Sequence, residues 1–269
     1  MNLRTSLLVV TTLVIAGLVS APAATVTFSN TNSIVINDSS SPPTIATPYP
    51  STNRVTGLDG TIITKVTLSL FGFAHTFPSD VDIVLVGPEG QNAIVLSNVG
   101  GSSATNAVTN IDLTLDDDAV SDLPVTNSLY SGTFKPTQGD PNPFLFDFPA
   151  PAPKTADLQG PFLSNFKNTE PNGTWNLFVV DDTASDSGVI TGGWSLTITT
   201  APVLLSIARQ QTNAIVSWTN AAVGYTLQST PALAPPGWTN VNIVPVVVDG
   251  YYTVTNPMTT SRAFYRLIK

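Results

Sequence analysis

Short stretches of alternating apolar and polar residues recur along most of the chain and predict β-strands. Within residues 62–73, Val66, Leu68 and Leu70 alternate with Thr and Ser, a pattern typical of a half-buried strand. Further strands are expected at residues 33–36, 81–86, 93–96, 108–115, 173–180 and 194–199. The tetrapeptide Gly87-Pro88-Glu89-Gly90 predicts a turn, because Pro presets φ and Gly tolerates positive φ.

A second set of strand-like segments begins after Ala201-Pro202, which marks a domain boundary. These segments are short, regularly spaced and separated by turn residues, the pattern of a small β-sandwich. They lie at residues 215–218, 225–228, 238–241, 251–254 and 264–267. The pattern therefore predicts an all-β protein with a β-sandwich over residues 25–200 and a smaller one over residues 201–269.

The first 24 residues have the features of a secretory signal peptide. Arg4 supplies a basic start, residues 7–19 form an uncharged apolar run, and Ala21-Pro22-Ala23 is a small-x-small cleavage site. The apolar run is about 13 residues long, whereas a membrane-spanning helix needs roughly 20. The mature protein is expected to begin near Ala24, to have no membrane span and to be secreted, either extracellular or periplasmic.

A proline-rich segment covers residues 133–162 and predicts a long loop, because proline removes hydrogen-bond donors from a strand. Long loops within compact domains are often functional. Two interpretations stay open for this segment: a functional flap, or a surface insertion without a role.

Composition narrows the function classes. The chain has 269 residues, no cysteine and a formal net charge of −8, with 10% charged residues. The missing cysteines exclude disulfides and thiol chemistry, and the acidic balance disfavours nucleic acid and anionic membrane surfaces as partners. Abundant Thr, Val, Ser and Gly favour strands and turns over helices.

Aspartate dominates the acids: 16 of 18 are Asp, and only Glu89 and Glu170 are glutamates. Three clusters stand out, formed by Asp80 and Asp82, by Asp116, Asp117 and Asp118, and by Asp181, Asp182 and Asp186. Short carboxylates on loops can surround Ca²⁺, which takes six to eight oxygen ligands. The candidate ligands are Asp80, Asp116, Asp117 and Asp181 first, then Asp82, Asp182 and Asp186. The alternative is that these side chains accept backbone N–H bonds at turns and strand ends.

Two segments carry motifs that occur in the order found in one known family. The first segment contains His75-Thr76, Asp80-Val81-Asp82-Ile83 and Leu85-Val86-Gly87-Pro88-Glu89-Gly90. The second contains Asn172-Gly173-Thr174-Trp175, Asp186-Ser187-Gly188 and Trp194-Ser195-Leu196. Between them stand Thr114-Leu115-Asp116-Asp117, Ser131-Gly132-Thr133-Phe134-Lys135-Pro136 and Phe162-Leu163-Ser164-Asn165-Phe166. As a set they resemble the P domain (Homo B domain), the β-jelly-roll module of subtilisin-like proprotein convertases and of many secreted bacterial proteases.

The resemblance covers roughly residues 33–200 and implies a jelly roll with Trp175 and Trp194 in its core. It also implies that the motifs specify a fold, because the family's protease activity lies in a domain that this chain lacks. His75 is the single histidine, and no Gly-x-Ser-x-Gly elbow is present, so a Ser-His-Asp hydrolase is a remote option. Structural Ca²⁺ in bacterial P-like domains adds weight to the cation hypothesis.

The C-terminal segments Tyr225-Thr-Leu-Gln-Ser229, Trp238-Thr-Asn-Val241 and Phe264-Tyr-Arg-Leu267 resemble the fibronectin-III-like modules that end many secreted proteins of environmental bacteria. The leading hypothesis is a noncatalytic secreted protein that binds an extracellular protein, a cell surface or a glycan. One alternative is an accessory partner of a separate subtilisin-like protease. Another is a carbohydrate-binding module that uses Trp218 or Trp238, although both tryptophans lie in apolar patterns that favour the core.

Overall fold

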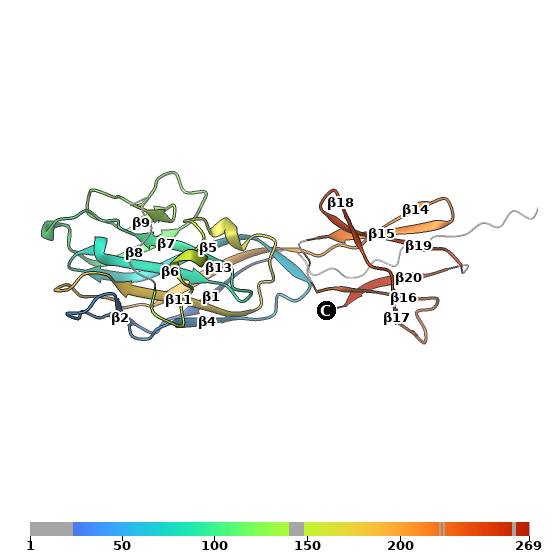
Figure 1. Ribbon diagram of the computed structural model, residues 1–269, viewed down its shortest axis with the longest axis horizontal. Coiled ribbons are helices and arrows are strands. Elements are labelled where there is room, and N and C mark those ends of the chain that lie inside the picture. The colour runs from blue at the N-terminus through green and yellow to red at the C-terminus, as the bar shows by residue number, and fades with distance from the viewer. Residues whose placement is uncertain (1–23, 140–147, 221, 223, 260–261, 269) are drawn as a thin grey trace, which may run out of the picture. The chain divides into compact units, whose positions relative to one another are not determined.

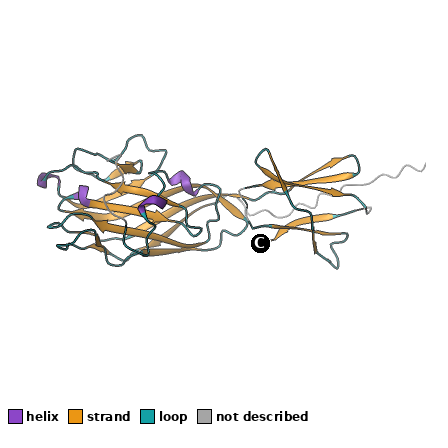
Figure 2. Ribbon diagram, in the orientation of Figure 1, coloured by secondary structure: helices purple, strands orange, loops and turns teal. Residues whose placement is uncertain are grey.

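The computed structural model describes residues 24–139, 148–220, 222, 224–259 and 262–268. Residues 1–23 of the expected signal peptide (1–24), including its cleavage site, lie outside the described residues, as do residues 140–147 of the proline-rich segment. The described chain is all-β, with 50% strand and 6% helix in several sheets and no barrel (Figures 1 and 2). It divides into two compact units, one over Ala21–Ala201 and one that includes Pro202–Lys269.

One sheet of the larger unit has the strand order β1-β13-β5-β12-β2, with β8 paired to β5 and β9 paired to β8. Its long central strand β5 bends at register shifts against β8, near Gly72. The strands of this sheet are β1 (Thr25–Asn30), β2 (Ile34–Ile36), β5 (Thr61–His75), β8 (Val108–Leu115), β9 (Gly132–Phe134), β12 (Gly188–Ile190) and β13 (Trp194–Pro202).

The other sheet of the larger unit has the order β10-β7-β6-β11-β3, and β4 also pairs with β11. The strands of this sheet are β3 (Thr44–Ile45), β4 (Ser51–Val55), β6 (Val81–Val86), β7 (Asn92–Ser97), β10 (Thr137–Gln138) and β11 (Gly173–Asp181). Short 3₁₀ turns occur at Pro78–Asp80, Ala104–Asn106, Thr155–Asp157 and Leu163–Phe166.

The two sheets pack face to face around one core that takes side chains from both. Trp175 of β11 and Trp194 of β13 are 0% exposed, as the sequence predicts for the core. Each indole N–H has a partner: that of Trp175 donates to the carbonyl of Pro171, and that of Trp194 donates to the Ser51 hydroxyl. The sandwich therefore buries large aromatic area without leaving these polar atoms unpaired.

A second apolar layer covers the outer face of the β6–β11 sheet. Val84, Phe178 and Val180 lie there against Phe148, which comes from the proline-rich segment. Residues 83–86 of β6 and 177–180 of β11 are buried on both faces, so these stretches are apolar without alternation.

The smaller unit contains a sheet of order β14-β15-β19-β18 and a sheet of order β17-β16-β20. One core cluster draws on both sheets and includes Trp218 of β15, Leu227 of β16 and Tyr265 of β20. Its strands are β14 (Ser206–Gln210), β15 (Asn213–Thr219), β16 (Thr226–Thr230), β17 (Thr239–Asn240), β18 (Val246–Val248), β19 (Tyr251–Pro257) and β20 (Phe264–Ile268).

The predicted strands are all present within a few residues, and 108–115 matches β8 at both ends. Several strands were not predicted. The outward positions of β1 are Thr25, Thr27 and Ser29, which weakens its apolar signal, and β9 and β10 overlap the segment expected to be loop. β3, β4, β12, β14 and β18 are also additional. Across the described ranges, no helix has the length and apolar character needed to cross a membrane.

We predict that Trp194→Ala lowers the free energy of unfolding by about 3 to 5 kcal/mol, because it opens a cavity between the sheets. Ser51→Ala should cost about 1 to 3 kcal/mol, because the buried indole N–H loses its acceptor. Urea denaturation followed by fluorescence measures both. Val120→Ala is the control, since Val120 is 99% exposed. A Trp194→Ala variant as stable as the control would contradict the packing of Trp194 between the two sheets.

Candidate functional site

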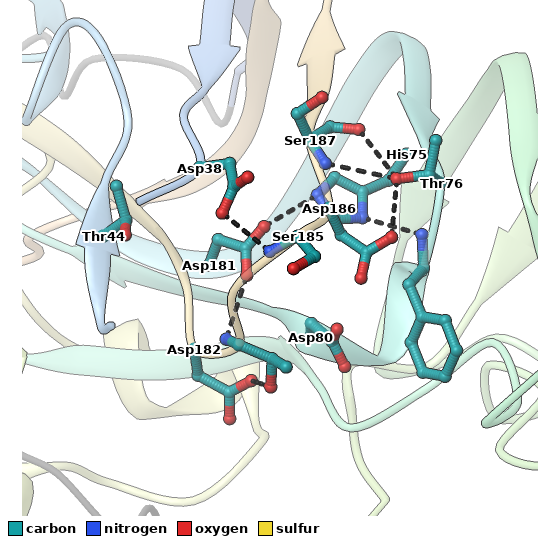
Figure 3. A network of polar contacts seen from close by, with 12 residues as sticks. Asp38, Thr44, His75, Thr76, Asp80, Asp181, Asp182, Ser185, Asp186 and Ser187 are labelled. Carbon is teal, nitrogen blue, oxygen red and sulfur yellow. Dashed lines mark hydrogen bonds and ion pairs between the residues drawn. The ribbon is translucent and has the colours of Figure 1, made fainter. Parts of the chain in front are cut away.

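Two of the three aspartate clusters meet where β6 begins and β11 ends. The antiparallel register places Val180 opposite Asp82 and Asp181 opposite Val81. The backbone N–H of Asp182 donates to the carbonyl of Asp80 at 2.8 Å, which holds the two chain segments together. Figure 3 shows Asp80, Asp181 and Asp182 around one end of the sandwich.

His75 links the two sheets at this end. Its Nε2 lies 3.1 Å from Oδ2 of Asp181, and both side chains are 0% exposed. Its Nδ1 accepts the backbone N–H of Phe77 at 3.1 Å, so the ring proton lies on Nε2 and is donated to Asp181. Both ring nitrogens are therefore engaged, and neither is free to serve as the base of a Ser-His-Asp triad.

The loop after β11 closes over the same end through polar contacts (Figure 3). The Thr76 hydroxyl donates to Oδ1 of Asp186 at 2.9 Å. The backbone N–H of Ser185 donates to Oδ1 of Asp38, also at 2.9 Å. Asp38 was not among the predicted residues, because an isolated Asp in a Ser-rich loop has no motif that marks it.

Asp82 is the least satisfied carboxylate of the group. It is 1% exposed, and among the described residues neither of its oxygens makes a well-formed hydrogen bond, although the Ser97 side chain lies near enough to favour the charged form. By strand alternation it shares the outer face of its sheet with Val84, whereas Val81 and Ile83 face the main core. A buried carboxylate without partners is costly, because ionisation in an apolar environment is disfavoured.

The crowding perturbs the titration of three acids. Burial, together with the charges of Asp182 and Asp181, raises the pKa of Asp80 to about 6. Burial raises the pKa of Asp82 well above its ordinary value, and the Ser97 side chain counters this rise only in part. Burial also raises the pKa of Asp182, and the charge of Asp181 adds to the increase. These carboxylates thus hold protons more tightly than in an unfolded chain.

The third aspartate cluster has a different role. Asp116 and Asp118 bind the Lys65 ammonium at 2.9 and 2.7 Å. Both oxygens of Asp117 accept backbone N–H groups, from Leu163 and Ser164, at 2.8 Å each. These acids stabilise a turn and a 3₁₀ segment, which was the alternative interpretation. The structure does not bring Asp116 and Asp117 to the other carboxylates.

The converging acids suit a hard cation by their chemistry. Ca²⁺ prefers carboxylate oxygens, and the two unpaired oxygens of Asp82 lie beside the charged Asp80 and Asp182. Within the described ranges, however, no three His, Asp or Glu side chains are already arranged to hold a metal ion. A cation would therefore have to draw these carboxylates together when it binds.

The tryptophans of the smaller unit differ in position. Trp218 is 1% exposed and belongs to the core, as expected. Trp238 was also expected in the core, but that prediction was wrong: its ring is half-buried beneath the Arg266 guanidinium, 4.4 Å from Cζ to the ring centroid. Trp238 immediately precedes β17, a two-residue strand at the edge of its sheet with both residues exposed, and an apolar sequence pattern does not reveal this edge position.

Comparison with known protein families, curated proteins and solved structures found no match for this chain.

We predict that, in EDTA, stability falls as pH rises from about 4 through about 6 and above. The folded-state pKa of Asp80 is about 6 and that of Asp82 is raised well above its ordinary value. The native state therefore binds these protons more tightly, and the stabilisation is lost as they dissociate.

The variant Asp82→Asn should be more stable than the parent at pH 8, by about 1 kcal/mol or more, because it removes a buried unpaired charge. The difference should vanish near pH 4, where the parent Asp82 is protonated. Thermal melts across this pH range measure it. The control Asp122→Asn removes an exposed carboxylate of the same unit and should show neither effect. If the stability difference between Asp82→Asn and the parent were the same at all pH values, the raised pKa of Asp82 would be contradicted.

Proposed function

We propose that this chain is a noncatalytic secreted protein, built from a P-domain-like jelly roll and a fibronectin-III-like module, that acts through extracellular contacts. The motif order of the larger unit and the strand spacing of the smaller one support this family interpretation. The apolar run followed by Ala21-Pro22-Ala23 supports secretion. Each unit packs two sheets around a core that contains buried tryptophan, and this arrangement is compatible with both proposed modules.

The observation that carries the proposal is the acidic end of the larger unit. Carboxylates from two strands converge there around a histidine that has no free nitrogen. Such a group cannot supply a base to a nucleophile, but it supplies oxygen ligands in a cluster that repels itself. We infer that a cation such as Ca²⁺ stabilises this end, held by Asp80, Asp82 and Asp182, with Asp181 and Asp186 beside them.

The role of the cation in this proposal is structural. Binding would offset the mutual repulsion of the carboxylates and satisfy the oxygens of Asp82. It would also hold the Asp38 and Asp186 loops against the end of the sandwich. The extracellular surface formed by these loops would then be ordered when Ca²⁺ is present.

We predict that Ca²⁺ raises the melting temperature of the mature protein relative to EDTA. At a free concentration of 100 Kd the added stability is about 2.7 kcal/mol for one site. Mg²⁺ should have a smaller effect, because it demands strict octahedral geometry. Differential scanning calorimetry at pH 7.5 measures the shift.

The double variant Asp80→Asn/Asp182→Asn should lose the Ca²⁺ response, because two of the ligands become neutral. Asp117→Asn is the matched control: it removes an acid that binds the Leu163 and Ser164 backbone instead, so the response should persist. The cation proposal fails if the parent shows no Ca²⁺ shift, or if the double variant responds like the parent.

A further inference from the structure

A row of polar side chains crosses the outer face of the β17-β16-β20 sheet. The register places Gln228 of β16 opposite Arg266 of β20 on one side and Asn240 of β17 on the other. Their neighbours Leu227 and Tyr265 point into the core, so the three row residues face away from it.

Hydrogen bonds run along this row in one direction. Nε of Arg266 donates to Oε1 of Gln228 at 2.8 Å, and Nε2 of Gln228 donates to Oδ1 of Asn240 at 2.9 Å. The Trp238 ring lies against the guanidinium. The stacked ring and the Nε bond together restrict the plane and the rotation of the Arg266 head.

The oriented guanidinium has no counter-ion. Among the described residues, Arg266 makes no ion pair, and its Nη atoms have no hydrogen-bond partner. Residues 202–269 contain a single acid, Asp249, against four basic residues, Arg209, Arg262, Arg266 and Lys269. Residues 25–201 contain 17 acids against 5 basic residues. Residues 202–269 thus carry a net positive charge, whereas residues 25–201 are strongly negative, so an anion is steered to the smaller unit.

We propose that this face binds a linear polysaccharide that carries carboxylates, with Arg266 as the carboxylate-binding group. The planar guanidinium fork matches a carboxylate in a bidentate pair. The side-chain nitrogen of Asn240, which has no partner among the described residues, supplies donors to a neighbouring sugar hydroxyl. Adjacent strands lie about 4.8 Å apart, so the donors form a line that an extended chain can follow. The proposal rests on the extracellular role above and is independent of the cation site.

The test measures binding of the mature two-unit chain to polygalacturonate by calorimetry, in EDTA and at low salt. The parent should bind polygalacturonate and should not bind neutral xylan. Arg266→Gln should weaken binding about tenfold or more, because a charge-assisted bidentate contact is lost. Arg209→Gln is the matched control: it makes the same change in net charge on β14 and should alter the affinity less than about twofold.

Arg266→Lys keeps the charge but cannot form the fork, and it should also weaken binding. This variant carries the test if Arg266→Gln fails to fold, which a thermal melt reveals. Equal losses in Arg266→Gln and Arg209→Gln would assign the binding to diffuse charge and overturn the proposal. It is also overturned if the parent does not bind, if Arg266→Lys binds like the parent, or if poly-glutamate binds as tightly as polygalacturonate. None of these outcomes alters the Ca²⁺ melt of the larger unit, so the two proposals fail separately.

Discussion

The antiparallel pairing of β6 with β11 is the constraint on which the larger unit depends. Its register sets Ile83 opposite Val179 and Leu85 opposite Leu177, and these side chains fill the space between the sheets. A slip of one residue would reverse the face of every side chain on the strand. The same register decides that the acids at the ends of both strands lie together, so the fold and the candidate site have one origin.

The acidic end combines a satisfied pair with unsatisfied neighbours. Asp181 accepts hydrogen bonds from His75 and from the Thr183 backbone N–H, so each of its oxygens has a partner. Among the described residues Asp82 makes no comparable hydrogen bond, although it lies one register step away on the opposite face of the strands. Proteins rarely keep a buried carboxylate without a partner unless a ligand or a titration uses it. This contrast supports a cation at Asp82 and Asp80 and leaves His75 in a structural role.

The two units differ in charge as well as in size. Acidic residues concentrate in the larger unit, where they cap turns, bind Lys65 or crowd at one end. In the smaller unit, Arg266 is held by Trp238 and Gln228, and no acid pairs with it among the residues that the structure describes. The overall net charge of −8 does not reflect this difference between the units. It disfavours anionic partners for an even charge distribution, but not for the smaller unit taken by itself.

The sequence alone determined the all-β class, most strands and the buried positions of Trp175, Trp194 and Trp218, because period-two alternation and apolar runs are local signals of burial. It could not determine which carboxylates meet. Asp80 and Asp181 come together, whereas Asp116 and Asp117 do not, because the register of strands distant in sequence decides these contacts. Nor could it place Trp238 against Arg266, because the pairing of β16 with both β17 and β20 brings these chain segments together. Local sequence patterns specify which residues are buried, whereas the pairing of strands distant in sequence specifies which residues they contact.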